Sequence, residues 1–145
     1  MRRTALRWGL SLLLCVSAVS LFPAVSLSPI VAQSSNGPDV KKLKNPVPVT
    51  PQSVNAGKDT FQKNCRSCHG ADGKGKGTMA PKNSQPSDLT DAQWTKGTTD
   101  GEIYAVLRDG AGPQSVMKGY KGRMTETELW SVVNYIRSLG PQGTR

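Results

Sequence analysis

Histidine, acidic residues and aromatic residues are all scarce in this chain of 145 residues. It has one histidine, 10 Asp and Glu residues against 19 Lys and Arg, and an aromatic content of 6%. No segment alternates convincingly between polar and apolar residues, and no internal repeat is found, which argues against strands and against a repeat array. Only one apolar run is long enough to cross a bilayer, so a protein with several membrane spans is excluded.

Apolar residues are also scarce once the N-terminal segment is set aside. Residues 1–32 hold 20 of the 52 apolar residues and no acidic residue. A small domain buries proportionally little of its surface, so the remaining chain has little apolar material for a core. A bound apolar cofactor, a metal or a disulfide would make up for this shortage.

The N-terminal segment has the pattern of an export signal. Three arginines precede an uncharged apolar run over residues 9–32, which Pro23 and Pro29 interrupt. This pattern predicts a signal peptide over residues 1–32 and a periplasmic or otherwise extracytoplasmic protein, with retention of the segment as a membrane anchor as the alternative.

The chain that remains after this segment is moderately basic. Removing the three arginines lowers the formal charge from +9 to +6. An exported chain without a basic stripe is not expected to bind nucleic acid, and an acidic protein surface or an anionic membrane face fits its charge better.

The rest of the chain divides into a Pro-rich segment and a helical domain. Residues 33–51 are expected to form an extended linker or a loosely docked arm, and residues 52–145 a domain. Capping signals predict helices that begin near Ser53, Thr99 and Thr125, with a short helical turn over residues 90–94. A Gly- and Pro-rich stretch over residues 70–88 predicts a long loop. The predicted fold class is all-α, with three to five helices and long loops.

One motif carries the chemistry, and it contains the chain's histidine and the two cysteines outside the leader. Residues 65–69 read Cys-Arg-Ser-Cys-His, the spacing of a c-type haem attachment site. Cys65 and Cys68 can form thioethers to one porphyrin, and His69 can then be the proximal ligand of the iron. Three alternatives are a structural disulfide, a thioredoxin-like redox pair and a zinc site. The disulfide leaves His69 unexplained, the redox pair lacks its βαβ setting, and zinc lacks a fourth ligand of the usual kind.

Over residues 53–139 the chain resembles the class I c-type cytochromes, which are small monohaem proteins. The resemblance rests on the helix that runs into Cys65–His69, the Gly-rich loop, a late methionine and a closing helix with Tyr135. It implies the cytochrome c fold, wrapped around one covalently attached haem c with its iron. It also implies that the first and last helices cross closely, with Gly57 and Phe61 on one facing Tyr135 and either Trp130 or Val133 on the other.

The resemblance further implies a methionine as the second axial ligand. Met117 is the expected ligand, because its spacing from His69 and Tyr135 matches the family pattern, although Lys118 stands where the family often has proline. Met79 follows the attachment motif too closely, and Met124 fits a hydrophobic staple before the last helix. The carbonyl of Pro81 is the expected hydrogen-bond acceptor for the other nitrogen of His69.

With both axial positions occupied, the expected function is electron transfer and not catalysis. The chain would shuttle electrons between an exported dehydrogenase or quinol-oxidising complex and a terminal oxidase or reductase. Exposed lysines would orient an acidic redox partner, the candidates being Lys74, Lys76, Lys118 and Lys121. Two alternatives stay open. One is a haem sensor or peroxidase-like protein with a labile sixth ligand. The other is a tethered cytochrome subunit of a larger dehydrogenase, which would meet a membrane only if the leader is retained.

Overall fold

The computed structural model describes residues 39–141 except Gln93 and Thr95, so the predicted leader lies outside the described residues. The elements are a 3-10 turn, η1 (Val40–Lys42), and four helices: α1 (Pro51–Asn64), α2 (Arg66–His69), α3 (Asp100–Asp109) and α4 (Glu126–Leu139). The described residues form two isolated bridges but no strand, which confirms the predicted all-α class. None of the helices in this part of the chain is both long enough and apolar enough to cross a membrane.

Three of the helices begin at a capping box, in which a threonine side chain and the residue three positions later satisfy each other's backbone amides. Thr99 and Thr125 cap α3 and α4, as predicted from the sequence. The start of α1 differs from the prediction: Thr50 is its N-cap, and Ser53 is the third helical residue of the same box. Pro51 takes the first helical position, where a missing amide hydrogen is tolerated, so the residue assigned to the linker belongs to the helix.

The short helical turn predicted at residues 90–94 is not seen in the described part of that segment. Residues 89–92 form bends, and Gln93 lies outside the described residues. The Asp88 carboxylate accepts hydrogen bonds from both the backbone amide and the hydroxyl of Thr90, at 2.8 and 2.6 Å. Thr90 therefore serves a local turn and not a helix cap.

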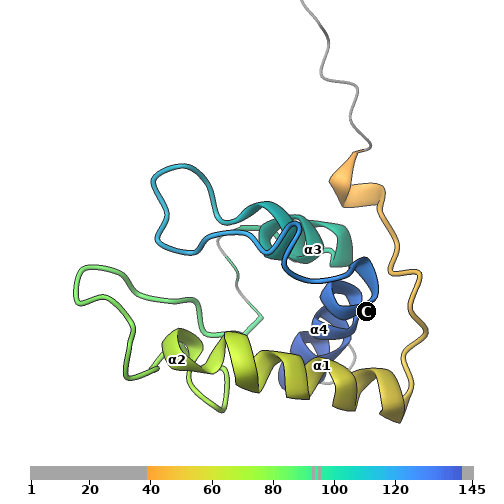
Figure 1. Cartoon of the computed structure of the whole chain (residues 1–145), viewed down its shortest axis with the longest axis horizontal. Coiled ribbons are helices and arrows are strands. Elements are labelled where there is room, and N and C mark those ends of the chain that lie inside the picture. Colours follow the sequence, from red (N-terminus) through yellow and green to blue (C-terminus); the bar gives the residue numbers. More distant parts are fainter. Residues whose placement is uncertain (1–38, 93, 95, 142–145) are drawn as a thin grey trace, which may run out of the picture. The chain divides into compact units, whose positions relative to one another are not determined.

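Helices α1 and α4 cross at the centre of the core (Figure 1). An added Cβ on Gly57 of α1 would lie 2.0 Å from the Ser131 carbonyl oxygen of α4, so only glycine fits at the crossing. The rings of Phe61 and Tyr135 meet beside it, with centroids 5.2 Å apart, which confirms the predicted pairing of these two residues. Trp130 instead stacks on Tyr104 of α3, at 4.1 Å between ring centroids. The apolar face of α4 is buried in the core through Leu129, Val132, Val133 and Ile136, with Leu139 partly buried.

Residues 39–50, here called the N-terminal arm, pack against the helices and do not hang free. Asn45 of the arm donates to the Asn134 side chain at 2.8 Å and to the Trp130 carbonyl at 3.1 Å, both in α4. At the other end of the arm, an added Cβ on Gly101 of α3 would lie 1.8 Å from the Val40 carbonyl oxygen. The part of the expected linker that the structure describes is thus a docked arm.

Candidate functional site

The cysteine–histidine motif lies where α1 passes into α2. Cys65 ends α1 and also precedes the single turn of α2. The amides of both Cys68 and His69 donate to the Cys65 carbonyl, at 3.2 and 3.0 Å, so one tight turn fixes the three residues relative to one another. Cys65 is buried, Cys68 is half-buried, and both thiols are free. The structure therefore shows neither the disulfide nor, in the strand-free described part of the chain, the βαβ setting of a redox pair.

The environment of Cys65 does not suit thiolate chemistry. Burial raises the pKa of the Cys65 thiol to about 11, and a hydrogen bond with the Tyr120 side chain offsets this only in part. A thiol with so high a pKa stays protonated near neutral pH, whereas redox-active cysteines have lowered pKa values. The arrangement fits a thiol that is converted once into a stable thioether.

The His69 ring is held in the orientation that a metal ligand needs. Its Nδ1 lies 3.3 Å from the carbonyl oxygen of Ser87, which can accept a hydrogen bond from this nitrogen and leave Nε2 free. Burial lowers the pKa of His69, and the Ser87 carbonyl opposes this shift, so the neutral imidazole that binds metal is favoured.

The acceptor for His69 differs from the one expected from the sequence. The Pro81 carbonyl, which was expected in this position, instead accepts hydrogen bonds from Ser84 within its own loop. The Gly-rich loop continues past Pro81 before it returns to the histidine. The hydrogen-bond partner of His69 is thus the backbone carbonyl of Ser87, which the fold brings close to the ring. No side-chain pattern in the sequence identifies this residue.

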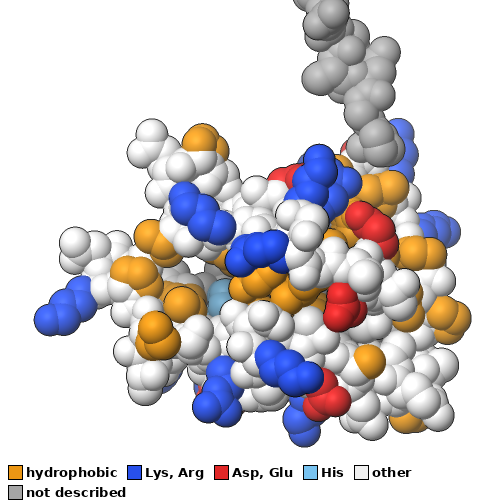
Figure 2. Space-filling view, viewed as in Figure 1, with side chains coloured by type: hydrophobic (Ala, Val, Ile, Leu, Met, Phe, Trp, Pro, Cys, Tyr) orange, Lys and Arg blue, Asp and Glu red, His pale blue; other side chains and the backbone are white. Residues whose placement is uncertain are grey.

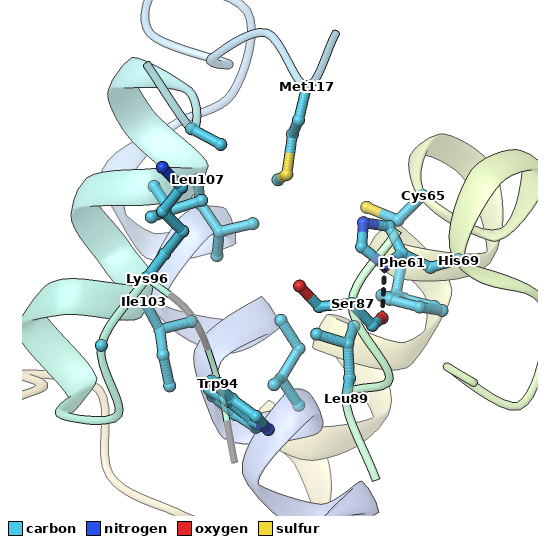
Figure 3. Close-up of a pocket in the computed structure, with 14 residues that line it drawn as sticks. Phe61, Cys65, His69, Ser87, Leu89, Trp94, Lys96, Ile103, Leu107 and Met117 are labelled. Carbon is cyan, nitrogen blue, oxygen red and sulfur yellow. Dashed lines mark hydrogen bonds between the residues drawn. The ribbon is translucent and has the colours of Figure 1, made fainter. Parts of the chain in front are cut away.

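A cavity opens in front of His69. It holds about 650 Å³ of space that no protein atom fills, part of it open to solvent. Met117 also lines this cavity, and it enters from a different segment than His69 with its thioether pointing inward (Figure 3). Most of the remaining wall is apolar and is formed by Phe61, Leu89, Trp94, Ile103, Val106, Leu107, Ala111 and Ile136.

The other two methionines outside the leader do not line this cavity. Met79 is 72% exposed, as expected of a residue in the loop that follows the motif. Met124 directly precedes the cap of α4 and packs partly buried against the core, in keeping with its predicted role as a staple. The methionine selected from the sequence is therefore the one that shares the cavity with His69.

Basic and apolar side chains surround the mouth of the cavity. In Figure 2 the pale-blue histidine, the only one in the chain, is visible in a hollow with orange apolar and blue basic side chains around it. Lys96 is the one charged residue among those that line the cavity, and it runs along its outer edge beside Leu107 (Figure 3).

A family model of cytochrome c matches residues 54–140, the segment that contains the motif, the cavity and α4. The chain belongs to the cytochrome c family. Among curated proteins, this cytochrome is 36% identical over 94 residues to the Cbb3-type cytochrome c oxidase subunit FixPc of Rhizobium leguminosarum bv. viciae, covering 64% of this chain and 30% of that subunit. It is 33% identical over 100 residues to subunit CcoP of Rhodobacter capsulatus, covering 64% and 31%. The chain thus spans about a third of the length of these relatives.

Solved structures show the same fold. One chain of the Kuenenia stuttgartiensis reducing HAO-like protein complex superimposes with a TM-score of 0.61 at 23% identity, covering 70% of this cytochrome and 49% of that chain. Cytochrome cL of Methylophaga aminisulfidivorans superimposes with a TM-score of 0.50 at 22% identity, covering 61% and 57%. At these identities the likeness concerns the fold alone.

The residues of this cytochrome fit a covalently bound haem c. The two free thiols lie one helical turn apart beside a histidine whose Nδ1 faces the Ser87 carbonyl, and the cavity in front of them is walled by apolar side chains. This cavity also explains how a chain with so few apolar residues forms a core, because a bound porphyrin would supply the missing apolar surface.

Sequence reasoning missed several residues of the site. Ser87, Trp94 and Lys96 reach the cavity from the loop between α2 and α3, and Tyr120 contacts Cys65 from the loop after α3. None of them belongs to a motif with fixed spacing from Cys65. A signal was present for Trp94 and Tyr120, since an aromatic residue in a polar loop calls for a buried partner.

Proposed function

We propose that this cytochrome is an exported electron carrier whose haem iron is held by His69 and Met117. The observation that carries the proposal is the shared cavity, which both the His69 ring and the Met117 thioether line. Bound haem c would supply an iron that changes between the ferric and ferrous states by one electron. Methionine as the second ligand favours the ferrous state and raises the reduction potential.

Occupation of both axial positions favours electron transfer over bond-making chemistry, because no substrate can reach the iron. The only histidine is His69 itself, so no second histidine is present to act as a distal acid or base. The apolar wall keeps water from the iron, and electrons would pass through an exposed haem edge at the mouth of the cavity. A peroxidase-like or sensing function requires that Met117 leave the iron.

The partners are proposed to be redox proteins with acidic docking faces. The formal charge of +9, and the basic side chains around the mouth of the cavity, support an encounter that weakens with salt. The relatives are subunits of cbb3-type oxidases, which supports work beside or within a larger redox complex. The basic, apolar N-terminal segment supports export, either as a cleaved signal or as an anchor.

The test is an optical spectrum of the holoprotein matured in a haem-attaching periplasm. Wild type is compared with Met117→Ala, with Met79→Ala and Met124→Ala as matched controls. We expect the ferric wild type and both controls to show the methionine–iron charge-transfer band, and their ferrous forms to exclude carbon monoxide. Met117→Ala is expected to lose the band and bind the gas. Ready binding of carbon monoxide by the wild type would refute the proposal and favour the sensing or peroxidase-like alternative.

A further inference from the structure

We propose that Tyr120 is a positioning residue that keeps Met117 in the cavity by tying its loop to the helix that carries the haem cysteines. The proposal rests on the proposed function, since it assigns a role around the same ligand. It starts from the residue that follows the methionine. Lys118 stands there and does not stiffen the backbone as a proline would, so other contacts must fix the loop.

Backbone hydrogen bonds fix the loop after α3 on one side of the cavity. The Met117 carbonyl accepts from the Ala111 amide at 3.1 Å, and the Tyr120 amide donates to the Leu107 carbonyl at 2.9 Å. The Lys121 amide donates to Arg108 at 2.9 Å in the same way. These bonds attach both flanks of Met117 to the C-terminal end of α3, but they leave its distance from α1 and α2 unset.

The Tyr120 side chain connects this loop to the C-terminal end of α1. Its hydroxyl donates to the Asn64 carbonyl at 2.9 Å, one residue before Cys65. This carbonyl is available because the helix breaks at Cys65: the Cys68 amide donates to Cys65 and not to Asn64. The phenol thus uses an acceptor that the attachment motif itself creates.

The ring of Tyr120 is held in place by its own neighbours. The Arg123 guanidinium lies 4.4 Å from the ring centroid, and it donates to the Gly119 carbonyl at 2.6 Å. The phenol also contacts the Cys65 thiol. A loop movement that withdraws Met117 from the cavity has to break the bond between Tyr120 and Asn64. The hydroxyl therefore opposes loss of the sixth ligand without touching the iron.

The experiment measures how easily an added ligand displaces Met117. Ferric holoprotein is titrated with imidazole, and the methionine charge-transfer band reports displacement. Tyr120→Phe removes the hydroxyl and keeps the ring. Tyr104→Phe is the matched control, because its hydroxyl also donates one hydrogen bond, to Glu126, but this bond joins α3 to α4 and does not involve the loop that carries Met117. We expect Tyr120→Phe to raise the apparent affinity for imidazole about 3- to 10-fold, and Tyr104→Phe to leave it at the wild-type value.

A second variant tests the same idea by rescue. Lys118→Pro introduces a rigid residue after Met117 and is expected to lower the imidazole affinity of Tyr120→Phe about 2- to 5-fold. An unchanged affinity in Tyr120→Phe would overturn the proposal, as would an equal rise in Tyr104→Phe, which would indicate general loosening. Absence of the charge-transfer band from the wild type would instead refute the ligand assignment. The two failures are therefore distinguishable.

Discussion

The α1–α4 crossing and the loop after α3 both position residues that line one cavity, and they do so by different means. The crossing is a contact of backbone against backbone at Gly57, sealed by the rings of Phe61 and Tyr135. The loop carries Met117 and is fixed by a few hydrogen bonds at its flanks. A substitution that separates the two helices should therefore unfold the domain. A substitution that displaces the loop should release Met117 from the iron while the domain stays folded.

The largest effect is expected from Gly57→Ala. The added methyl would lie 2.0 Å from a backbone oxygen of α4, which cannot move unless the helices separate. We expect the free energy of unfolding to fall by at least about 3 kcal/mol, or the holoprotein not to accumulate. Denaturant titration measures the loss, and Asn55→Ala at an exposed site of α1 is the control, with a change close to zero. A Gly57→Ala protein of wild-type stability would refute the close crossing.

Gly119→Ala places the same small change in the loop. An added Cβ there would lie 2.3 Å from the Arg108 carbonyl, so the segment after Met117 would be forced away from α3. We expect a smaller loss of about 1–3 kcal/mol in unfolding free energy, together with a weakened or absent methionine charge-transfer band. The spectrum and the denaturant titration are measured on the same sample. Loss of stability with a wild-type band would mean that the loop position does not control the ligand.

The Asn134 side chain joins α4 to the N-terminal arm, and its removal is expected to have an intermediate effect on stability. Its side chain is 2% exposed and accepts from Asn45 at 2.8 Å, while it donates to Ser53 at 3.1 Å and to the Val47 carbonyl at 3.2 Å. Asn134→Ala removes these hydrogen bonds from a buried position and is expected to cost about 2 kcal/mol of stability, although Asn45 and Ser53 keep their other partners. Because the arm lies away from the cavity lining, the haem spectrum should stay unchanged. A shifted spectrum would show that the arm does influence the ligands.

The smallest effect is expected at the cap of α4. Hydrogen bonds from the backbone and side chain of Thr125 lower the pKa of Glu128 below its ordinary value near 4.5. A lowered folded-state pKa means that the stabilisation is complete above the unfolded-state pKa and is lost as the pH falls through the folded-state value. Glu128→Gln should therefore lower the melting temperature slightly at pH 7, and the difference should shrink as the pH falls below 4.5 and through the folded-state pKa. A pH-independent difference would contradict this role of the carboxylate.

The sequence was sufficient wherever the signal is local. The spacing of Cys65, Cys68 and His69 is set by one helical turn, and the caps at Thr99 and Thr125 each involve four consecutive residues, so all could be read directly. The start of α1 was misplaced because the proline run that ends at Pro51 suggested a linker, although proline also suits the first helical position.

Contacts between segments that are distant in the sequence could not be predicted from local patterns. The acceptor for His69 is the Ser87 carbonyl, a backbone group that every residue possesses, so Pro81 could not be rejected before the loop was placed. The Asn64 acceptor for Tyr120 exists only because the helix breaks at Cys65. Met117 was selected by its spacing from His69 and Tyr135 in the family pattern, because the residues next to it do not by themselves mark a ligand.

The central claim is that Met117 binds the haem iron, and its most direct test is to identify the methionine that is the ligand. Holoprotein with isotope-labelled methionine methyl groups is reduced, and its methyl resonances are recorded by NMR for the wild type and for Met117→Ala, Met79→Ala and Met124→Ala. A methyl group bound over the porphyrin is displaced far from the others by the ring current. We predict one such resonance, absent only from Met117→Ala. Its persistence in Met117→Ala, or its loss in either control, would contradict the account.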